Sequence, residues 1–345
     1  MDLRFTSRTS VTYLAGLGVS IVIFAVILFS FGYNPTLSIE TIATGSFGTT
    51  FNATSTLVLT VPFLLAALSF LVPFKARFYN VGVEGQIYLG ALTAYLMASQ
   101  LGGVPNFVAV FLVGVAGFLG GTLWLALPLL MKVKLQVNEL FPTLVLNFVA
   151  LDLVNWLTSG PIKDPRSVNP QTPIVPHSTW LPIIIPGTPL DAGIVIAVLA
   201  AIAVYFVLQK TVLGYEIRAS GANPRAASAG GVSLARSTLI VGLLSGGLAG
   251  LAGMVIVTTG NHWLVQNFSP GYGYMGIGVA ALANFNPVGT IFAAILYSAL
   301  WVGGQALEVL PGSEAVPIYF IYILQATVVL VVLMVQRFLL GRRRT

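Results

Sequence analysis

Long apolar segments alternate with short polar connectors along the whole chain. Most of these segments hold about 20 residues, enough to cross a ~30 Å hydrocarbon core as an α-helix. The pattern predicts an all-α, polytopic membrane protein with about ten transmembrane helices. The eighth and ninth segments are short, so each is a candidate for a re-entrant segment that does not cross. The predicted segments are 11–32, 54–74, 80–101, 107–131, 140–158, 190–208, 237–258, 275–283, 288–303 and 317–336.

The amino-acid composition also indicates a membrane protein. Of the 345 residues, 57% are hydrophobic and 8% are charged, against about 25% charged residues in a soluble domain. We expect one transmembrane domain over residues 1–345, and the first segment is too long for the core of a cleaved signal peptide. Without cysteine there is no disulfide or thiolate site. His177 and His262 lie far apart, so no metal site is predicted, and no catalytic constellation suggests an enzyme.

The basic residues give the predicted sidedness. If successive connectors lie on alternate sides, only Lys163 and Arg166 of the 16 Lys and Arg fall on the outer side. The positive-inside rule then places both termini in the cytoplasm. It also explains the net charge of +6 without nucleic-acid binding, which we do not expect.

Two groups of predicted helices, the second to fifth and the seventh to tenth, begin on opposite sides of the membrane. This parity permits an inverted repeat, although residues 78–92 and 268–282 match at only four of 15 positions. The connector 159–189 is predicted to be external and holds eight of the 19 prolines. It either docks a partner protein or forms a stiff cap over the helix ends.

Polar residues at the start of the third segment are candidates for the solute path: Asn80, Glu84 and Gln86. A carboxylate at the bilayer centre costs about 2.5–3.5 kcal/mol, so Glu84 needs a partner or a wet cavity. On a regular helix Asn80 and Glu84 share a face, whereas Gln86 lies about 200° from Glu84. Local unwinding at Gly82 and Gly85 would bring them together. The alternative is a structural helix start with Asn80 as its cap.

The fifth segment offers Asn147, Asp152 and Asn155, which fall within an arc of about 140° on a helix and can face one interior. Asn147 is the fourth candidate for the solute path. The alternative is hydrogen bonding between helices, worth about 0.6 kcal/mol for each bond.

The connector 211–236 is longer than a link between two helices requires. Residues 211–220 can form a helix, 221–224 form a turn signal, and 225–229 can start a second helix. Such a cytoplasmic helix–turn–helix suggests a surface for another protein, the alternative being a solvated basic connector. The chain has no phosphate-binding loop of the G-x-x-x-x-G-K-[ST] type. If ATP drives this protein, another subunit must bind it.

Residues in this connector resemble those of permease subunits of ABC importers, in the group for branched-chain amino acids, ribose, simple sugars and nucleosides. In that family the loop is the coupling element on the ATPase subunit. The resemblance implies an ATPase-coupling role for the following residues: Thr211, Gly214, Arg218, Gly221, Asn223 and Pro224.

The stretch Asn80–Gln86 resembles the signature of the nucleoside and simple-sugar branch of the same family, as do Asn138-Glu139 and residues 159–165 and 268–274. The resemblance covers roughly residues 50–305. It implies import of a nucleoside, or secondly a simple sugar, across the inner cell membrane by alternating access. It also implies a second and different permease chain, ATPase subunits that bind ATP and Mg²⁺, and an external solute-binding protein, with no cofactor on this chain. The rival hypothesis is a stand-alone, proton-coupled secondary transporter that uses Glu84 or Asp152.

Overall fold

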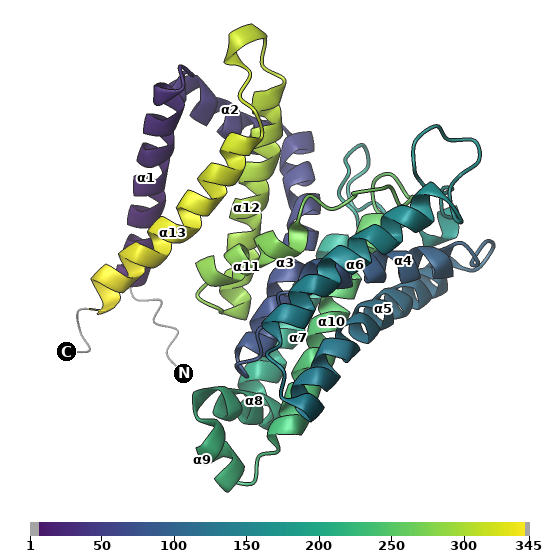
Figure 1. Ribbon diagram of the computed structural model, residues 1–345. Helices are drawn as coiled ribbons and strands as arrows, with labels where there is room; N and C mark the ends of the chain where they lie inside the picture. Colours follow the sequence, from purple (N-terminus) through teal and green to yellow (C-terminus); the bar gives the residue numbers. More distant parts are fainter. Residues whose placement is uncertain (1–6, 342–345) are drawn as a thin grey trace.

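The structure is a computed structural model that describes residues 7–341. Regular structure in this part of the chain is helical throughout, apart from two isolated β-bridges (Figure 1). The predicted all-α class is therefore confirmed. The α-helices are α1 (Ser7–Ser30), α2 (Pro35–Phe47), α3 (Thr50–Phe74), α4 (Val83–Ala98), α5 (Asn106–Leu135), α6 (Leu140–Ser159), α7 (Gly193–Lys210), α8 (Val212–Ala222), α9 (Pro224–Ala229), α10 (Leu234–Thr258), α11 (Tyr272–Leu282), α12 (Pro287–Glu308) and α13 (Tyr319–Gly341).

Within the described residues, eight helices are long and apolar enough to cross a membrane: α1, α3, α5, α6, α7, α10, α12 and α13. Two further predicted segments form shorter helices, α4 with 16 residues and α11 with 11 residues. At 1.5 Å per residue these reach about 24 Å and 17 Å, less than the ~30 Å hydrocarbon core. The ninth predicted segment is not short, because α12 has 22 residues. The segment shortened in its place is the third.

Of the eight long helices, α3 and α10 are the two most buried, and they lie against each other at the centre of the bundle. Helix α3 packs against α11 and α12, and α10 packs in the same way against α4 and α5. If α3–α6 correspond to α10–α13, each central helix therefore packs on the next two helices of the other group. This reciprocal packing agrees with the predicted grouping into an inverted repeat.

Glycine lets α4, α5 and α10 approach until their backbones touch. A Cβ on Gly250 of α10 would collide with the carbonyl oxygen of Gly117 in α5, and a Cβ on Gly90 of α4 would collide with Gly250. Gly121 and Gly246 form the next contact of the same kind along α5 and α10. The glycines on the facing sides of α5 and α10 thus serve close packing, as expected where helices associate without a hydrophobic driving force.

Helix α2 was not predicted, because its segment is polar and lies between the first two predicted transmembrane segments. Asn34 caps it by accepting hydrogen bonds from Thr36 N and Leu37 N, and Pro35 occupies its first position. The helix then packs on α12, where a Cβ on Gly45 would lie 2.6 Å from the Ala306 side chain. Helices α1 and α13 pack along each other beside this part of the bundle (Figure 1).

The proline-rich segment 159–189 contains no α-helix and lies against the connector between α10 and α11. Its backbone pairs with that connector through Thr172 N and Leu264 O at 2.9 Å and through Val175 N and His262 O at 2.9 Å. The Trp180 ring stacks on His262 with 3.8 Å between ring centroids. This packing fits the predicted cap over the helix ends.

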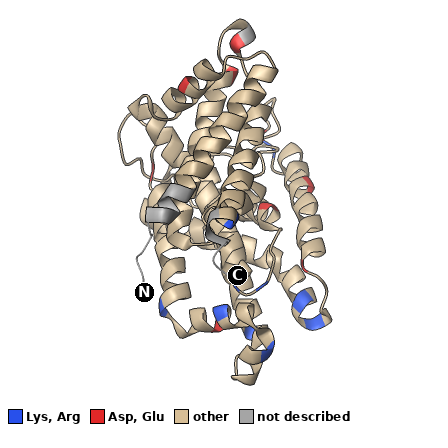
Figure 2. Ribbon diagram, turned by 90° about the vertical axis from the view of Figure 1, so that its left-hand side faces the viewer, with Lys and Arg blue, Asp and Glu red and all other residues tan. Residues whose placement is uncertain are grey.

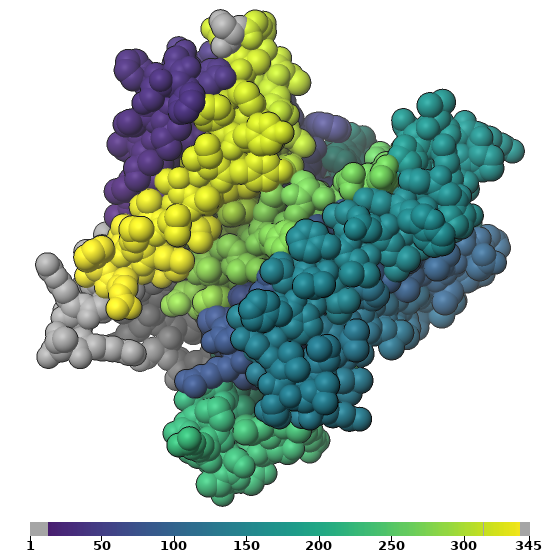
Figure 3. All heavy atoms as spheres, in the orientation of Figure 1, coloured from purple at the N-terminus to yellow at the C-terminus, as the bar shows by residue number. Residues whose placement is uncertain are grey.

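Basic and acidic residues gather at opposite ends of the molecule. Figure 2 shows most Lys and Arg at the end that carries α8 and α9, and most Asp and Glu toward the other end. Helices α8 and α9 project from the basic end as a small lobe (Figure 3). This separation is the one that the positive-inside rule requires of a protein whose basic end is cytoplasmic.

Candidate functional site

The start of α4 is unwound, and its polar residues bond to one another. Asn80 lies before the helix, and its amide forms a reciprocal pair with Gln86: each Nδ2 or Nε2 donates to the other's carbonyl oxygen at 2.9 Å. Asn80 Oδ1 also accepts from Gly82 N at 3.0 Å. Regular helix geometry therefore does not relate Asn80 to Glu84, because α4 begins only at Val83, and the chain is unwound at Gly82, as the interpretation by local unwinding required. Asn80 faces Gln86, which regular geometry had placed apart.

The amide pair is joined to the two central helices. Asn80 Nδ2 donates to Ser245 Oγ of α10 at 2.8 Å. Ser245 Oγ in turn donates to the Ser69 carbonyl of α3 at 2.7 Å, and Ser69 Oγ donates back to the Ser245 carbonyl at 2.8 Å. Neither serine was predicted as a site residue. Isolated serines in apolar helices carry no spacing signal that marks them.

Glu84 is 3% exposed and lies at the first turn of α11. Its Oε2 accepts a hydrogen bond from Gly273 N at 2.6 Å. A Cβ on Gly273 would collide with the backbone N of Glu84, so α4 and α11 meet start to start in van der Waals contact. The unpaired N–H groups at a helix start favour an anion. The backbone of α11 therefore supplies the partner that a buried carboxylate needs.

Asn147 connects α6 to both short helices. Its Oδ1 accepts from Gly85 N at 2.8 Å, and its Nδ2 donates to the Val81 carbonyl at 2.9 Å and to the Tyr274 hydroxyl at 3.0 Å. The four predicted solute-path residues thus meet in one group, each at most 3% exposed. We call this group the polar cluster. It consists of Ser69, Asn80, Glu84, Gln86, Asn147, Ser245 and Tyr274.

Asp152 and Asn155 are not part of this cluster, so the predicted common interior for the three polar residues of α6 was wrong. The Asp152 side chain is exposed. Asn155 bonds instead to Asn267 in the connector before α11, with 2.8 Å between Nδ2 and Oδ1.

The segment 211–236 folds as the predicted helical pair. Thr211 caps α8 by accepting from Gly214 N at 3.1 Å. Asn223 caps α9 by accepting from Arg225 N at 3.1 Å, and Pro224 takes the first helical position. Helix α8 continues to Ala222, so the predicted turn begins two residues later than expected.

Helix α8 rests directly on the connector between α3 and α4. A Cβ on Gly221 would collide with the Lys75 carbonyl, and Arg77 donates from Nη2 to the Ala222 carbonyl at 3.2 Å. Arg218 Nη1 is buried with no hydrogen-bond partner among the described residues. Burial, followed by the positive charge of Arg218, lowers the pKa of Lys75. This connector leads within a few residues to Asn80, so α8 and the polar cluster share one short stretch of chain.

An ion pair between half-buried Lys132 and buried Glu139 holds the same connector from the other side. Glu139, before α6, is 4% exposed and lies 2.7 Å from Lys132 Nζ, and its Oε1 accepts from Tyr79 N at 3.2 Å. Burial alone would raise the pKa of Glu139, but Lys132 and the Tyr79 N–H lower it below its ordinary value. Tyr79 immediately precedes Asn80, which fixes the backbone at the entrance to the cluster.

None of these groups suits a metal ion. Within residues 7–341 there is no group of three or more His, Asp or Glu side chains that could hold one. The chemistry that the site offers is therefore hydrogen bonding and helix contact.

A protein-family model described as "Branched-chain amino acid transport system / permease component" matches residues 52–334. The glucose ABC transporter permease protein TsgB13 of Haloferax volcanii is 34% identical over 290 residues, covering 81% of this chain and 75% of that protein. The nucleoside ABC transporter permease protein NupB of Lactococcus lactis is 27% identical, covering 88% and 85%. The guanosine ABC transporter permease protein NupP of Bacillus subtilis is 29% identical, covering 85% and 86%.

Lactococcus lactis also has a second matching protein, the nucleoside ABC transporter permease protein NupC. It is 26% identical over 278 residues, covering 77% of this chain and 85% of NupC. One organism thus holds two different relatives of this chain whose names describe the same kind of transporter.

Proposed function

Because the chain belongs to the family of branched-chain amino acid transport system permease components, and is an ABC transporter permease of the sugar and nucleoside type, we propose that it imports a small polar solute across the inner cell membrane by alternating access. A nucleoside is the first choice of solute and a simple sugar the second. The relatives support both, since TsgB13 is named for glucose, NupB for nucleosides and NupP for guanosine.

The energy for import comes from a separate ATPase subunit that binds ATP and Mg²⁺. This subunit contacts α8 and α9. The observation that carries this proposal is the contact of Gly221 with Lys75, which seats α8 on the connector leading to the polar cluster. The buried and unpartnered Arg218 Nη1, beside a second cation, suits an acidic group of that partner. Six residues form the proposed coupling site: Thr211, Gly214, Arg218, Gly221, Asn223 and Pro224.

In this proposal the moving part of the solute path contains four residues of the polar cluster: Asn80, Glu84, Gln86 and Asn147. They hold together the starts of α4 and α11 and one side of α6. A movement of α8 reaches them through the connector that begins at Lys75. Bonds of this kind have discrete arrangements, so a small displacement can exchange one set for another.

The complete importer contains a second, different permease chain and an external solute-binding protein. The pair NupB and NupC in one organism supports the second permease. The acidic end of the molecule, with the segment 159–189, would face the binding protein.

Uptake by reconstituted complexes tests this function. The chain, expressed with its second permease and its ATPase, is placed in vesicles with the cognate binding protein and radiolabelled adenosine or glucose. The proposal expects uptake that requires internal ATP and survives collapse of the proton gradient. Uptake by the chain alone, driven by a proton gradient, would establish the rival secondary transporter instead.

A further inference from the structure

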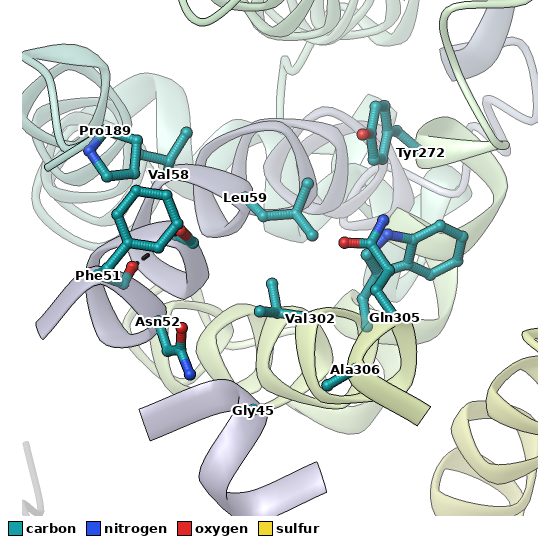
Figure 4. A pocket seen from close by; sticks show the side chains of 12 residues that line it. Gly45, Phe51, Asn52, Val58, Leu59, Pro189, Tyr272, Val302, Gln305 and Ala306 are labelled. Carbon is teal, nitrogen blue, oxygen red and sulfur yellow. Dashed lines mark hydrogen bonds between the residues drawn. The ribbon is translucent and has the colours of Figure 1, made fainter. Parts of the chain in front are cut away.

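A cavity of about 510 Å³ lies between α2, α3 and α12 (Figure 4). It is in the half of the bundle opposite α8 and α9, and Tyr272, the first residue of α11, forms part of its wall. Its volume is within the range of sites for small molecules, which are typically apolar and aromatic with a few polar groups. Neither the polar cluster nor the segment 211–236 contributes to its lining.

The lining combines aromatic rings with uncharged polar groups. Phe51, Trp301 and Tyr272 supply the rings. The amide and hydroxyl groups come from Asn52, Ser55 and Gln305. Among residues 7–341, no Asp, Glu, Lys, Arg or His lines the cavity. A charged solute would lose its hydration there without gaining a partner of opposite charge.

The side-chain amides of Asn52 and Gln305 have hydrogen-bond donors or acceptors that are not used within the described residues. Asn52 Nδ2 donates to the Thr44 carbonyl at 3.0 Å, but its Oδ1 has no donor among the described residues. Gln305 is exposed, and its side chain forms no hydrogen bond within residues 7–341. Amides with open donors and acceptors bond hydroxyl groups from either side, and aromatic faces stack on planar rings.

We propose that this cavity is a binding site for the transported solute, a neutral, hydroxylated ring compound such as a nucleoside or a simple sugar. The ring lies against Trp301 and Tyr272, and its hydroxyl groups bond to Asn52 and Gln305. This assignment rests on the proposed function and extends it. Because Gly273, the next residue after Tyr272, donates to Glu84, a solute on Tyr272 acts on the first turn of α11 and through it on the polar cluster.

Cysteine labelling tests the site directly, because the chain has no cysteine of its own. Ser55→Cys places one thiol in the cavity wall, and the assembled complex in right-side-out vesicles is treated with a membrane-impermeant maleimide. We expect labelling that slows at least fivefold with saturating adenosine or glucose. Ser99→Cys, exposed at the end of α4, serves as the control that labels equally with and without solute. Ser298→Cys, fully buried in α12, should remain unlabelled.

The second test fills the cavity with a larger side chain and measures uptake. Val302→Trp places a large ring in the cavity and should lower uptake at least tenfold, whereas Val288→Trp, on the same helix but outside the cavity, should not. The assignment is overturned if Ser55→Cys does not label where Ser99→Cys does, or if the transported probe gives no protection. Protection without ATP-driven uptake would support the cavity assignment and contradict the proposed importer, so the two failures are distinguishable.

Discussion

The carboxylate of Glu84 in α4 accepts a hydrogen bond from the backbone N–H of Gly273 in α11, with 2.6 Å between the two atoms. The residues are 189 positions apart, yet they join the starts of the two shortest helices of the predicted repeat. The first N–H groups of each helix have no acceptor within their own helix, so a negative charge between the two helix starts is stabilised by both helices. Glu84 is thereby explained without a basic partner.

Removing this carboxylate should destabilise the protein. Glu84→Ala leaves the buried Gly273 N–H without its acceptor, which costs about 1–3 kcal/mol in the free energy of unfolding. Glu84→Gln keeps an acceptor oxygen and should lose less, and ATP-driven uptake should follow the same order. Thermal unfolding of the detergent-purified protein measures the difference. Asp152→Ala, at an exposed carboxylate, is the control; equal stability of Glu84→Ala and this variant would contradict the assignment.

The glycine contact between α5 and α10 should tolerate no side chain. Gly250→Ala places a Cβ against the Gly117 carbonyl. The helices must then move apart, which should lower the free energy of unfolding by several kcal/mol. Gly114→Ala on α5 meets only Met254 Cε at 4.0 Å and should fold normally. The yield of monodisperse protein after size-exclusion chromatography compares them. A normal yield of Gly250→Ala would show that the backbones do not touch.

The pair of Glu139 and Lys132 should make stability depend on pH. The pKa of Glu139 in the folded protein is below its ordinary value of 4.5, so its contribution is complete above pH 4.5 and is lost as the pH falls through the folded pKa. Glu139→Gln should therefore lower the unfolding temperature at neutral pH and differ less from wild type at about pH 4. Glu314→Gln, at an exposed carboxylate, should match wild type. A Glu139→Gln deficit that does not shrink in acid would refute the ion pair.

Some features of the fold and of the candidate site could be predicted from the sequence more completely than others, and the reasons are physical. The long helices, the charge separation and the helical pair within 211–236 arise from local composition, and they could be read from short windows. The polar cluster could be predicted only in part. Asn80, Glu84, Gln86 and Asn147 stand out in apolar segments, but Ser69 and Ser245 matter only because α3 and α10 touch.

Two features of the fold were decided by tertiary contact. Regular helix geometry does not apply to Asn80, because the chain is unwound just before α4, where this helix meets α11. Helix α2 escaped prediction because its apolar partner is α12, some 250 residues away, and the segment itself is polar. In both cases the deciding contact lies outside any local window.

The central claim is that α8 couples ATP hydrolysis to the helices through its contact with the connector at Lys75. Gly221→Ala disturbs this contact, Arg218→Glu reverses the charge offered to the ATPase, and Gly230→Ala is the matched control, since a Cβ there comes no closer than 3.4 Å to its neighbours. The most direct measurement is the ratio of solute imported to ATP hydrolysed in vesicles that contain the whole complex. We predict at least a tenfold fall for Gly221→Ala and Arg218→Glu, with normal insertion, and no change for Gly230→Ala. A normal ratio in both variants would contradict the account.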